Sequence, residues 1–214
     1  MLLQLGYLSL CLLGGPSQHP VFQSPITVSE GSEAFAAVSK QLGDAPVVRA
    51  IFAQEKHLTA LSRPLRSNGS FLFSATKGVY WHTHTPFDAI FIITPEAIIQ
   101  IEDGERTFEV KASEQPVIHG FTRVFLPLFG GDPEALEQSF QLYFSGDATQ
   151  WVLGLEPRSK LLEKLIGSIV LTGSKTIESV VIQERSGDAT HILFSEQVTE
   201  PPVLTPEENA YFEQ

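Results

Sequence analysis

The residues best suited to chemistry in this sequence are two histidines in the segment Trp81-His82-Thr83-His84. Side chains two positions apart on a β-strand point to the same face, which is how paired imidazoles chelate a metal. The nearest carboxylate, Asp88, lies beyond Pro86, so no third ligand is close in sequence. We expect a structural or solvent-facing role for the pair. A metal-dependent small-molecule enzyme using His82 and His84 is kept as the alternative.

No other catalytic motif is present in the chain. It contains no glycine-rich nucleotide-binding motif, P-loop, serine-nucleophile motif or His-Glu-x-x-His sequence. Glu102 and Asp103 lie beside a turn, where solvation is their simplest role, and Glu134 and Glu137 are typical of an exposed helix face. The sequence therefore predicts no enzymatic activity, no catalytic residue, no cofactor and no metal.

The charge balance excludes further classes of function. The 214 residues contain 14 Lys and Arg against 25 Asp and Glu, a net charge of −11 at pH 7. This argues against a nucleic-acid backbone or an anionic membrane surface as the main partner. A single cysteine, Cys11, excludes an internal disulfide and a cysteine-based zinc site. Only 18% of the residues are charged, so the chain is acidic and yet poor in charges.

The first residues are typical of a targeting segment. Leu2 to Leu13 is mostly apolar, too short to span a bilayer but suited to the apolar region of a secretory signal peptide. We expect residues 1–17 to be a signal peptide and residues 18–28 a linker. Because the first basic residue is Lys40, a hydrophobic N-terminal helix packed on the domain is the alternative. Lipid attachment at Cys11 is disfavoured by the preceding Leu10.

The hydrophobic pattern predicts one mostly β domain over residues 29–198, then a frayed polar tail over residues 199–214. Helices are expected around residues 30–43 and, interrupted by Pro127, around residues 117–140, with Asp132 as a helix N-cap. Segment 47–61 fits a helix or a strand. Period-two alternation predicts strands over residues 67–75, 79–83, 89–94, 97–101, 106–111, 140–144, 150–156, 167–172, 177–184 and 190–195. Their even spacing favours one antiparallel sheet.

The predicted fold class is therefore α+β and mostly β, a single curved antiparallel sheet (an open half-barrel) with helical lids over an apolar cavity. The chain has 15 Phe and 4 Tyr, which is compatible with binding an acyl chain, although a tightly packed core is the other interpretation. Strand parity selects as cavity-lining residues Phe71, Phe73, Val79, Trp81, Phe91, Ile93, Ile99 and Ile101 from the sheet, and Phe121, Phe125, Leu128 and Phe129 from the lid. If the other face is the inner one, they are replaced by Leu72, Tyr80, Ile90 and Ile92.

Several short segments, in this order and spacing, match the pattern of a known family. They are Phe52-Ala53-Gln54, Ser67 to Phe73, Gly78-Val79-Tyr80-Trp81, Pro86 before Ile90 to Ile93, Trp151 to Arg158, and the hairpin from Ile177 to Phe194. Over roughly residues 30–196 the chain resembles the LolA family, the periplasmic carriers of outer-membrane lipoproteins.

The resemblance implies a non-enzymatic, monomeric carrier in the periplasm of a Gram-negative bacterium. It would bind the acyl chains of a lipoprotein, or another lipid such as a polyene or glycolipid, and move them towards the outer membrane. Each methylene hidden from water is worth about 0.8 kcal/mol, which explains the need for a carrier. The implied partners are an inner-membrane donor protein and an outer-membrane acceptor protein, and no nucleic acid.

One departure from the family concerns the contact that holds its lid closed. The family's Arg-Pro pair before the Trp strand is replaced by Ala75-Thr76. Either Lys77 or Arg63 substitutes for that arginine, or the lid is controlled differently. An outer-membrane acceptor lipoprotein of similar fold, anchored through Cys11, is the last alternative.

Overall fold

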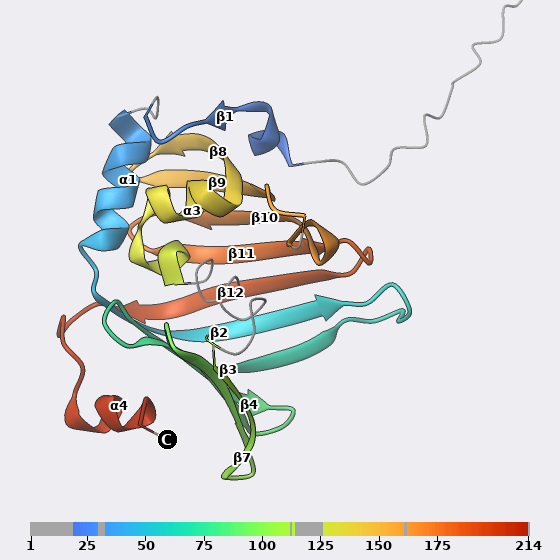
Figure 1. Cartoon of the computed structure of the whole chain (residues 1–214), viewed down its shortest axis with the longest axis vertical. Helices are drawn as coiled ribbons and strands as arrows, with labels where there is room; N and C mark the ends of the chain where they lie inside the picture. Colours follow the sequence, from blue (N-terminus) through green and yellow to red (C-terminus); the bar gives the residue numbers. More distant parts are fainter. Residues whose placement is uncertain (1–18, 30–32, 112, 114–125, 161, 214) are drawn as a thin grey trace, which may run out of the picture.

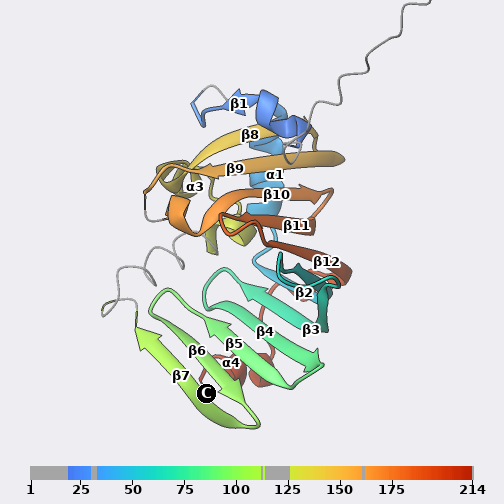
Figure 2. The ribbon, with the colours of Figure 1, turned by 90° about the vertical axis from the view of Figure 1, so that its right-hand side faces the viewer.

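The computed structural model describes residues 19–29, 33–111, 113, 126–160 and 162–213. Its centre is one antiparallel sheet of twelve strands in the order β1-β8-β9-β10-β11-β12-β2-β3-β4-β5-β6-β7. The sheet is strongly twisted, with α1 and α3 lying across one of its faces (Figures 1 and 2). Its two end strands do not pair with each other, so it remains open. The predicted fold class, a mostly β protein with one curved antiparallel sheet, is confirmed.

The bounds of the elements follow the chain. The strands are β1 (Pro25–Ile26), β2 (Val47–His57), β3 (Leu65–Ser74), β4 (Gly78–Thr85), β5 (Ala89–Ile93), β6 (Ala97–Glu102), β7 (Glu105–Lys111), β8 (Phe140–Asp147), β9 (Gln150–Pro157), β10 (Ile166–Gly173), β11 (Ile177–Glu184) and β12 (Ala189–Val198). The helices are α1 (Glu33–Gly43), α3 (Pro133–Ser139) and α4 (Pro206–Tyr211), with short 3-10 turns η1 (Pro20–Gln23) and η2 (Leu162–Lys164). Residues 126–130 are helical as well.

The predicted strands all appear, each within three residues of the expected bounds. Most of the ambiguous segment 47–61 forms strand β2, which ends at His57, and Val48, Ala50 and Phe52 alternate as buried residues along it. Asp132 is the N-cap of α3, accepting a hydrogen bond from the backbone N–H of Ala135 at 3.0 Å.

Some predictions concern segments outside the residues that the structure describes. The expected signal peptide with Cys11, and most of the helical interval before residue 126, lie outside the described residues. Of the helices that are described, none has the length and apolar character needed to cross a membrane.

The larger core lies between the helices and one face of the sheet, which we call the inner face. Phe35, Val38 and Leu42 of α1 are buried there at helical spacing. The sheet contributes alternate residues of its strands, among them Phe52 and Phe73, which are almost fully buried. The amphipathic pattern of α1 and the period-two pattern of the strands thus meet in one apolar layer.

A glycine allows the covering helices to approach one another closely. Gly131 follows the helical residues 126–130 and has a φ angle of 64°, in the left-handed region that favours glycine. A Cβ atom at this position would lie 2.4 Å from the carbonyl oxygen of Ser39 and 2.7 Å from the backbone nitrogen of Gly43. Any side chain at residue 131 would therefore push the second helical segment away from α1.

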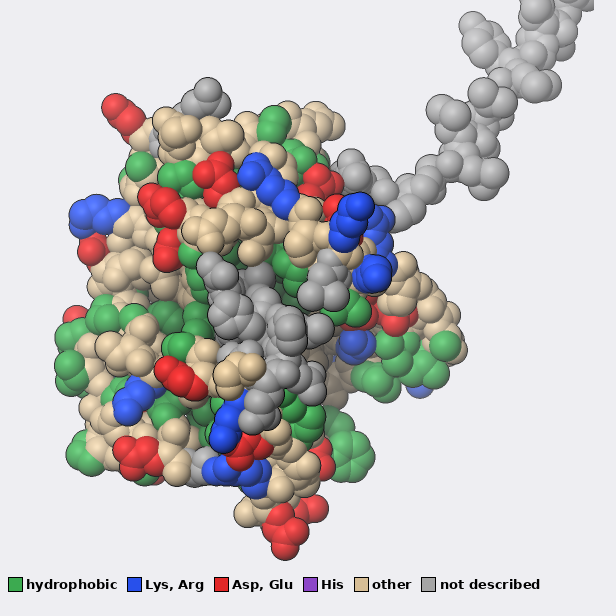
Figure 3. Space-filling view, in the orientation of Figure 1, with side chains coloured by type: hydrophobic (Ala, Val, Ile, Leu, Met, Phe, Trp, Pro, Cys, Tyr) green, Lys and Arg blue, Asp and Glu red, His purple; other side chains and the backbone are tan. Residues whose placement is uncertain are grey.

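The connection between β2 and β3 projects from the end of the sheet. Apolar side chains gather at its tip, on the right of the space-filling view in Figure 3. Residues Leu61 and Leu65 of this hairpin are exposed.

A smaller apolar core occupies the opposite, outer face of the sheet. Its buried members come from strands β2 to β6 and are Val47, Leu72, Tyr80, Ile92, Ala97, Ile99 and Ile101. Leu204, Tyr211 and Phe212 of the C-terminal segment pack against them. The expectation of a frayed tail is therefore wrong, because these apolar residues have a surface on which to pack.

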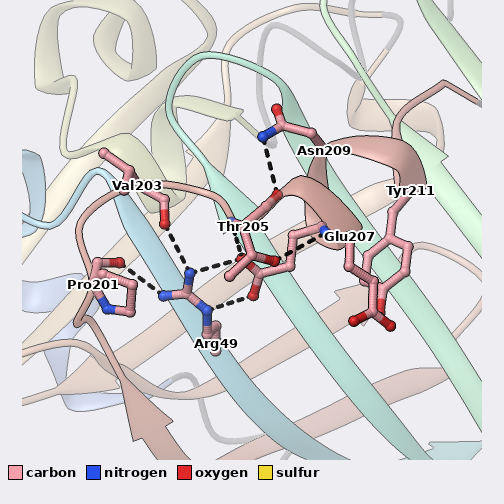
Figure 4. Close-up of polar contacts among 8 residues, drawn as sticks. Arg49, Pro201, Val203, Thr205, Glu207, Asn209 and Tyr211 are labelled. Atoms are coloured by element: carbon pink, nitrogen blue, oxygen red, sulfur yellow. Dashed lines mark hydrogen bonds and ion pairs between the residues drawn. The ribbon is translucent and has the colours of Figure 1, made fainter.

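Arg49 of β2 holds this C-terminal segment in place (Figure 4). Its Nε and Nη2 donate to the two carboxylate oxygens of Glu208 at 2.6 and 2.8 Å. Its Nη1 and Nη2 also donate to the backbone carbonyls of Pro201 and Val203, both at 3.0 Å. The side chains of Arg49 and Glu208 are only 21% and 16% exposed. We call this set of contacts the Arg49 clamp.

Removing the arginine tests the clamp. We expect Arg49→Met to lower the free energy of unfolding by about 1–3 kcal/mol, because a half-buried carboxylate and two carbonyls lose their donors. Urea denaturation measures the loss, and limited proteolysis should cut the C-terminal segment faster. Arg66→Met is the matched control, since Arg66 pairs with Glu55 in solvent with 75% of its side chain exposed. Equal stability of the two variants would contradict the assigned role.

The clamp also predicts an acid-sensitive contribution to stability. The hydrogen bonds from Arg49 lower the pKa of Glu208 from 4.5 to about 2. A carboxyl whose pKa is lowered by folding stabilises the protein above its unfolded pKa, and that contribution is lost as pH falls from about 4.5 to about 2. We expect Glu208→Gln to flatten the dependence of the unfolding free energy on pH in that window. Glu96→Gln, at an exposed turn, should leave the dependence unchanged.

Candidate functional site

A cluster of aromatic side chains lies at the centre of the inner face. It is formed by Phe52, Phe71, Phe73, Trp81, Phe129 and Phe194, and we call it the aromatic cluster. Phe71 lies at its middle, with ring centroids 4.9 Å from Phe194 and 5.9 Å from Trp81. The ring of Phe52 lies 3.9 Å from that of Trp81. Strands that are far apart in sequence, β12 and β4, thus share one apolar site.

Phe129 is the member of the cluster that comes from a helical segment. Its ring centroid lies 4.9 Å from Phe71, 5.8 Å from Phe73 and 6.0 Å from Phe194. Residue 129 is also nearly fully buried. One side chain therefore inserts between aromatic rings of the sheet and attaches the helical cover to it.

The spaces left beside the cluster are small. One, lined among others by Leu42, Phe71 and Phe129, has a volume of about 10 Å³. Another lies under α1 and α3, outside the cluster itself; it is lined among others by Leu128, Leu136 and Trp151 and has about 20 Å³. Volumes of this size hold about one water molecule. For an acyl chain to enter here, the helical cover must move away from the sheet.

Polar contacts at one end of α1 help to hold this cover. The backbone carbonyl of Ser174, in the turn between β10 and β11, accepts a hydrogen bond from the side-chain amide of Gln41. It accepts a second from Nε1 of Trp151 at 2.8 Å. Neither Lys77 nor Arg63, expected as replacements for the family's arginine, forms a side-chain hydrogen bond or ion pair with any residue that the structure describes.

Most of the predicted cavity residues lie together on the inner face. They are Phe71, Phe73, Val79, Trp81, Ile93, Leu128 and Phe129, all in or packed against the inner core. Phe91 pairs with Trp81 and shares its face. Phe121 and Phe125 lie outside the described residues. That these residues line a lipid site stays a prediction.

The assignment of Ile99 and Ile101 to the same face is wrong. In the β5–β6 hairpin Ile93 pairs with Ile98 and Ile92 with Ile99, so the inner residues of β6 are Ile98 and Gln100. The turn sets this register, since the N–H and carbonyl of Ala97 bond to Thr94. Ile99 and Ile101 consequently join the outer core.

Two members of the aromatic cluster were not predicted. Phe52 and Phe194 face each other across the β2–β12 pair. Period-two alternation marks both, through Val48 and Ala50 before Phe52 and Ile192 before Phe194. What the sequence does not show is the pairing of strands more than 130 residues apart.

The histidine pair lies on the outer face, on the side away from the aromatic cluster. Nε2 of His82 lies 3.1 Å from the Asp88 carboxylate, and Nε2 of His84 lies 3.2 Å from the Ser70 hydroxyl. The two rings meet edge to face with centroids 4.4 Å apart. Within the described part of the chain, no group of three or more His, Cys, Asp or Glu residues is arranged to hold a metal ion.

Comparison with known proteins gives a family. The model of the family described as outer membrane lipoprotein carrier protein LolA-like matches residues 30–206. A search of curated proteins found no match.

Solved structures show only distant likeness. A LolA superfamily protein from Nitrosomonas europaea has 7% identity and a TM-score of 0.43, over 78% of this chain and 93% of that one. An outer membrane lipoprotein-sorting protein domain from Vibrio parahaemolyticus has 10% identity and a TM-score of 0.42, over 83% and 97%. MucB has 13% identity and a TM-score of 0.42, over 83% and 63%. At such TM-scores these structures carry no argument about the site.

The insertion of Phe129 predicts a large loss of stability on truncation. We expect Phe129→Ala to lower the free energy of unfolding by about 3 kcal/mol, because a buried ring is removed and a cavity is left. Phe108→Ala is the control: this ring, on edge strand β7, is 45% exposed and should cost less than about 1 kcal/mol. Urea denaturation measures the free energy of unfolding of both variants. A decrease for Phe129→Ala no larger than that for Phe108→Ala would show that the Phe129 ring does not anchor the cover.

Proposed function

This chain belongs to the LolA-like family of outer membrane lipoprotein carrier proteins, and we propose that it binds the acyl chains of a lipoprotein or another lipid. The chains would lie on the inner face of the sheet, beneath the helical cover. The observation that carries the proposal is the aromatic cluster with Phe129 inserted into it. The cluster is a continuous apolar surface that a helical segment covers.

The driving force would be the removal of apolar surface from water. Burying about 15 methylenes of one acyl chain is worth roughly 12 kcal/mol, at about 0.8 kcal/mol each. Against this stands the loss of the contacts that Phe129 and its neighbours make with the sheet. The net affinity is the difference, and release follows when a membrane or an acceptor binds the lipid more tightly.

The proposal also includes the cellular location of the protein and its lack of enzymatic activity. We place the protein in the periplasm, where it would take lipid from an inner-membrane donor and carry it towards the outer membrane as a non-enzymatic monomer. Support comes from the family and from the leader-like apolar segment at residues 2–13. The remaining predicted residues of the inner face would contact the lipid, namely Phe71, Phe73, Val79, Trp81, Phe91, Ile93, Leu128 and Phe129.

The two tryptophans of the chain allow a direct test, because one lies in the aromatic cluster and the other does not. In Trp151→Phe the remaining indole is Trp81, and in Trp81→Phe it is Trp151, which is buried between α1 and the sheet. We expect a brominated fatty acid or lipidated peptide to quench the fluorescence of Trp151→Phe protein strongly. The fluorescence of Trp81→Phe protein should be quenched less, because Trp151 lies outside the aromatic cluster, although in the same inner core.

Native mass spectrometry of the purified protein provides the independent measurement. A bound or exchangeable amphiphile supports the proposal. Absence of any bound amphiphile, together with unquenched Trp81, would overturn it. Quenching of both tryptophans to the same extent would show that lipid binds without preference for the aromatic cluster.

A further inference from the structure

Three chain connections lie next to one another at one end of the sheet. They are residues 58–64 between β2 and β3, residues 158–160 and 162–165 between β9 and β10, and residues 185–188 between β11 and β12. The strands they join are consecutive in the sheet, β9-β10-β11-β12-β2-β3. All three lie on the right in Figure 1. We call them, with Leu65 at the start of β3, the hairpin rim.

Hydrogen bonds join these connections into one surface. The backbone N–H and the hydroxyl of Thr59 donate to Oδ1 of Asp188 at 2.8 and 3.1 Å. The backbone N–H of Arg185 donates to the carbonyl of Leu165, and its Nε to the carbonyl of Glu163, both at 3.1 Å. Each of the three connections is thus bonded to another, so their backbones are held next to one another.

The rim presents apolar side chains to solvent. Leu61, Leu65 and Leu165 are 49%, 52% and 55% exposed. The first two lie on the hairpin that projects on the right of Figure 3. These side chains project outward and do not line a groove. They are therefore suited to insertion into a deformable surface.

The rim also differs in charge from the rest of the chain. Its three connections contain five basic residues, Arg63, Arg158, Lys160, Lys164 and Arg185, against two acidic ones, Glu163 and Asp188. The whole chain has 14 basic against 25 acidic residues. None of Arg63, Lys160 and Lys164 forms an ion pair with a described residue. The net charge of −11 therefore argues against membrane binding by the chain as a whole but not by this end of it.

We propose that the hairpin rim docks on the surface of an anionic lipid bilayer. Leucine side chains would enter the interfacial layer while lysine and arginine side chains lie beside the lipid phosphates. The acidic remainder of the protein is repelled by the same surface, so docking has one orientation. The proposal goes beyond the carrying of lipid and does not require that any cargo be bound.

Charge reversal at two lysines provides the test. Unloaded full-length protein is sedimented with vesicles of phosphatidylglycerol and phosphatidylethanolamine, or with vesicles of phosphatidylcholine alone, at low salt. We expect binding to the anionic vesicles, lowered roughly tenfold or more by Lys164→Glu. Lys175→Glu makes the same change in net charge in the turn between β10 and β11, at the opposite end of the sheet, and should leave binding unchanged. Both variants keep the same N-terminal segment, so their difference reports the rim alone.

A second pair of variants tests the apolar part. Leu61→Asp should weaken binding to anionic vesicles, whereas Val203→Asp, at a residue that is 64% exposed in the C-terminal segment, should not. Thermal unfolding of each variant checks that it is folded. Equal binding of Lys164→Glu and Lys175→Glu, or no binding to anionic vesicles, would overturn the proposal. A third result would also overturn it: binding only to native membranes, and loss of that binding when the membrane proteins are digested. The rim would then be a protein-binding surface.

Discussion

A sheet that is apolar on both faces needs a cover on each, and this requirement shapes the whole protein. On strands β3 and β4 the inner residues Phe71 and Phe73 and the outer residues Leu72 and Tyr80 are all buried. An open sheet cannot hide both faces within itself. The chain covers the inner face with α1, residues 126–130 and α3, and the outer face with its C-terminal segment.

The two covers are held by different forces. The outer one is fixed by the Arg49 clamp and by stacking of Tyr211 on Tyr80, with ring centroids 4.6 Å apart. The inner one is held chiefly by apolar contacts centred on Phe129. In the proposed binding of lipid, an acyl chain would replace the apolar contacts that the inner cover gives up. A charged clamp has no such substitute, which suits a face that stays closed.

Local patterns in the sequence predict the strands well, because burial on one face imposes alternation on each strand separately. They fail where the answer depends on a turn or on a distant partner. Strand parity alone puts Ile99 on the same face as Ile93. The Thr94–Ala97 turn instead pairs Ile99 with Ile92, so Ile99 lies on the outer face. The partner of Glu208 is Arg49, 159 residues away, and no local pattern reveals it. Thr205, Pro206 and Glu208 mark the start of α4 in the sequence, but the polar composition of the segment favours a frayed tail.

The contact of Gly131 with α1 limits how the inner cover can move. The backbone at residue 131 lies so close to Ser39 and Gly43 that a single methyl group has no room. Segments in such close contact cannot slide along one another without first separating. In the proposed opening of the inner face, the two helical segments would therefore swing away from the sheet together and would not slide past each other.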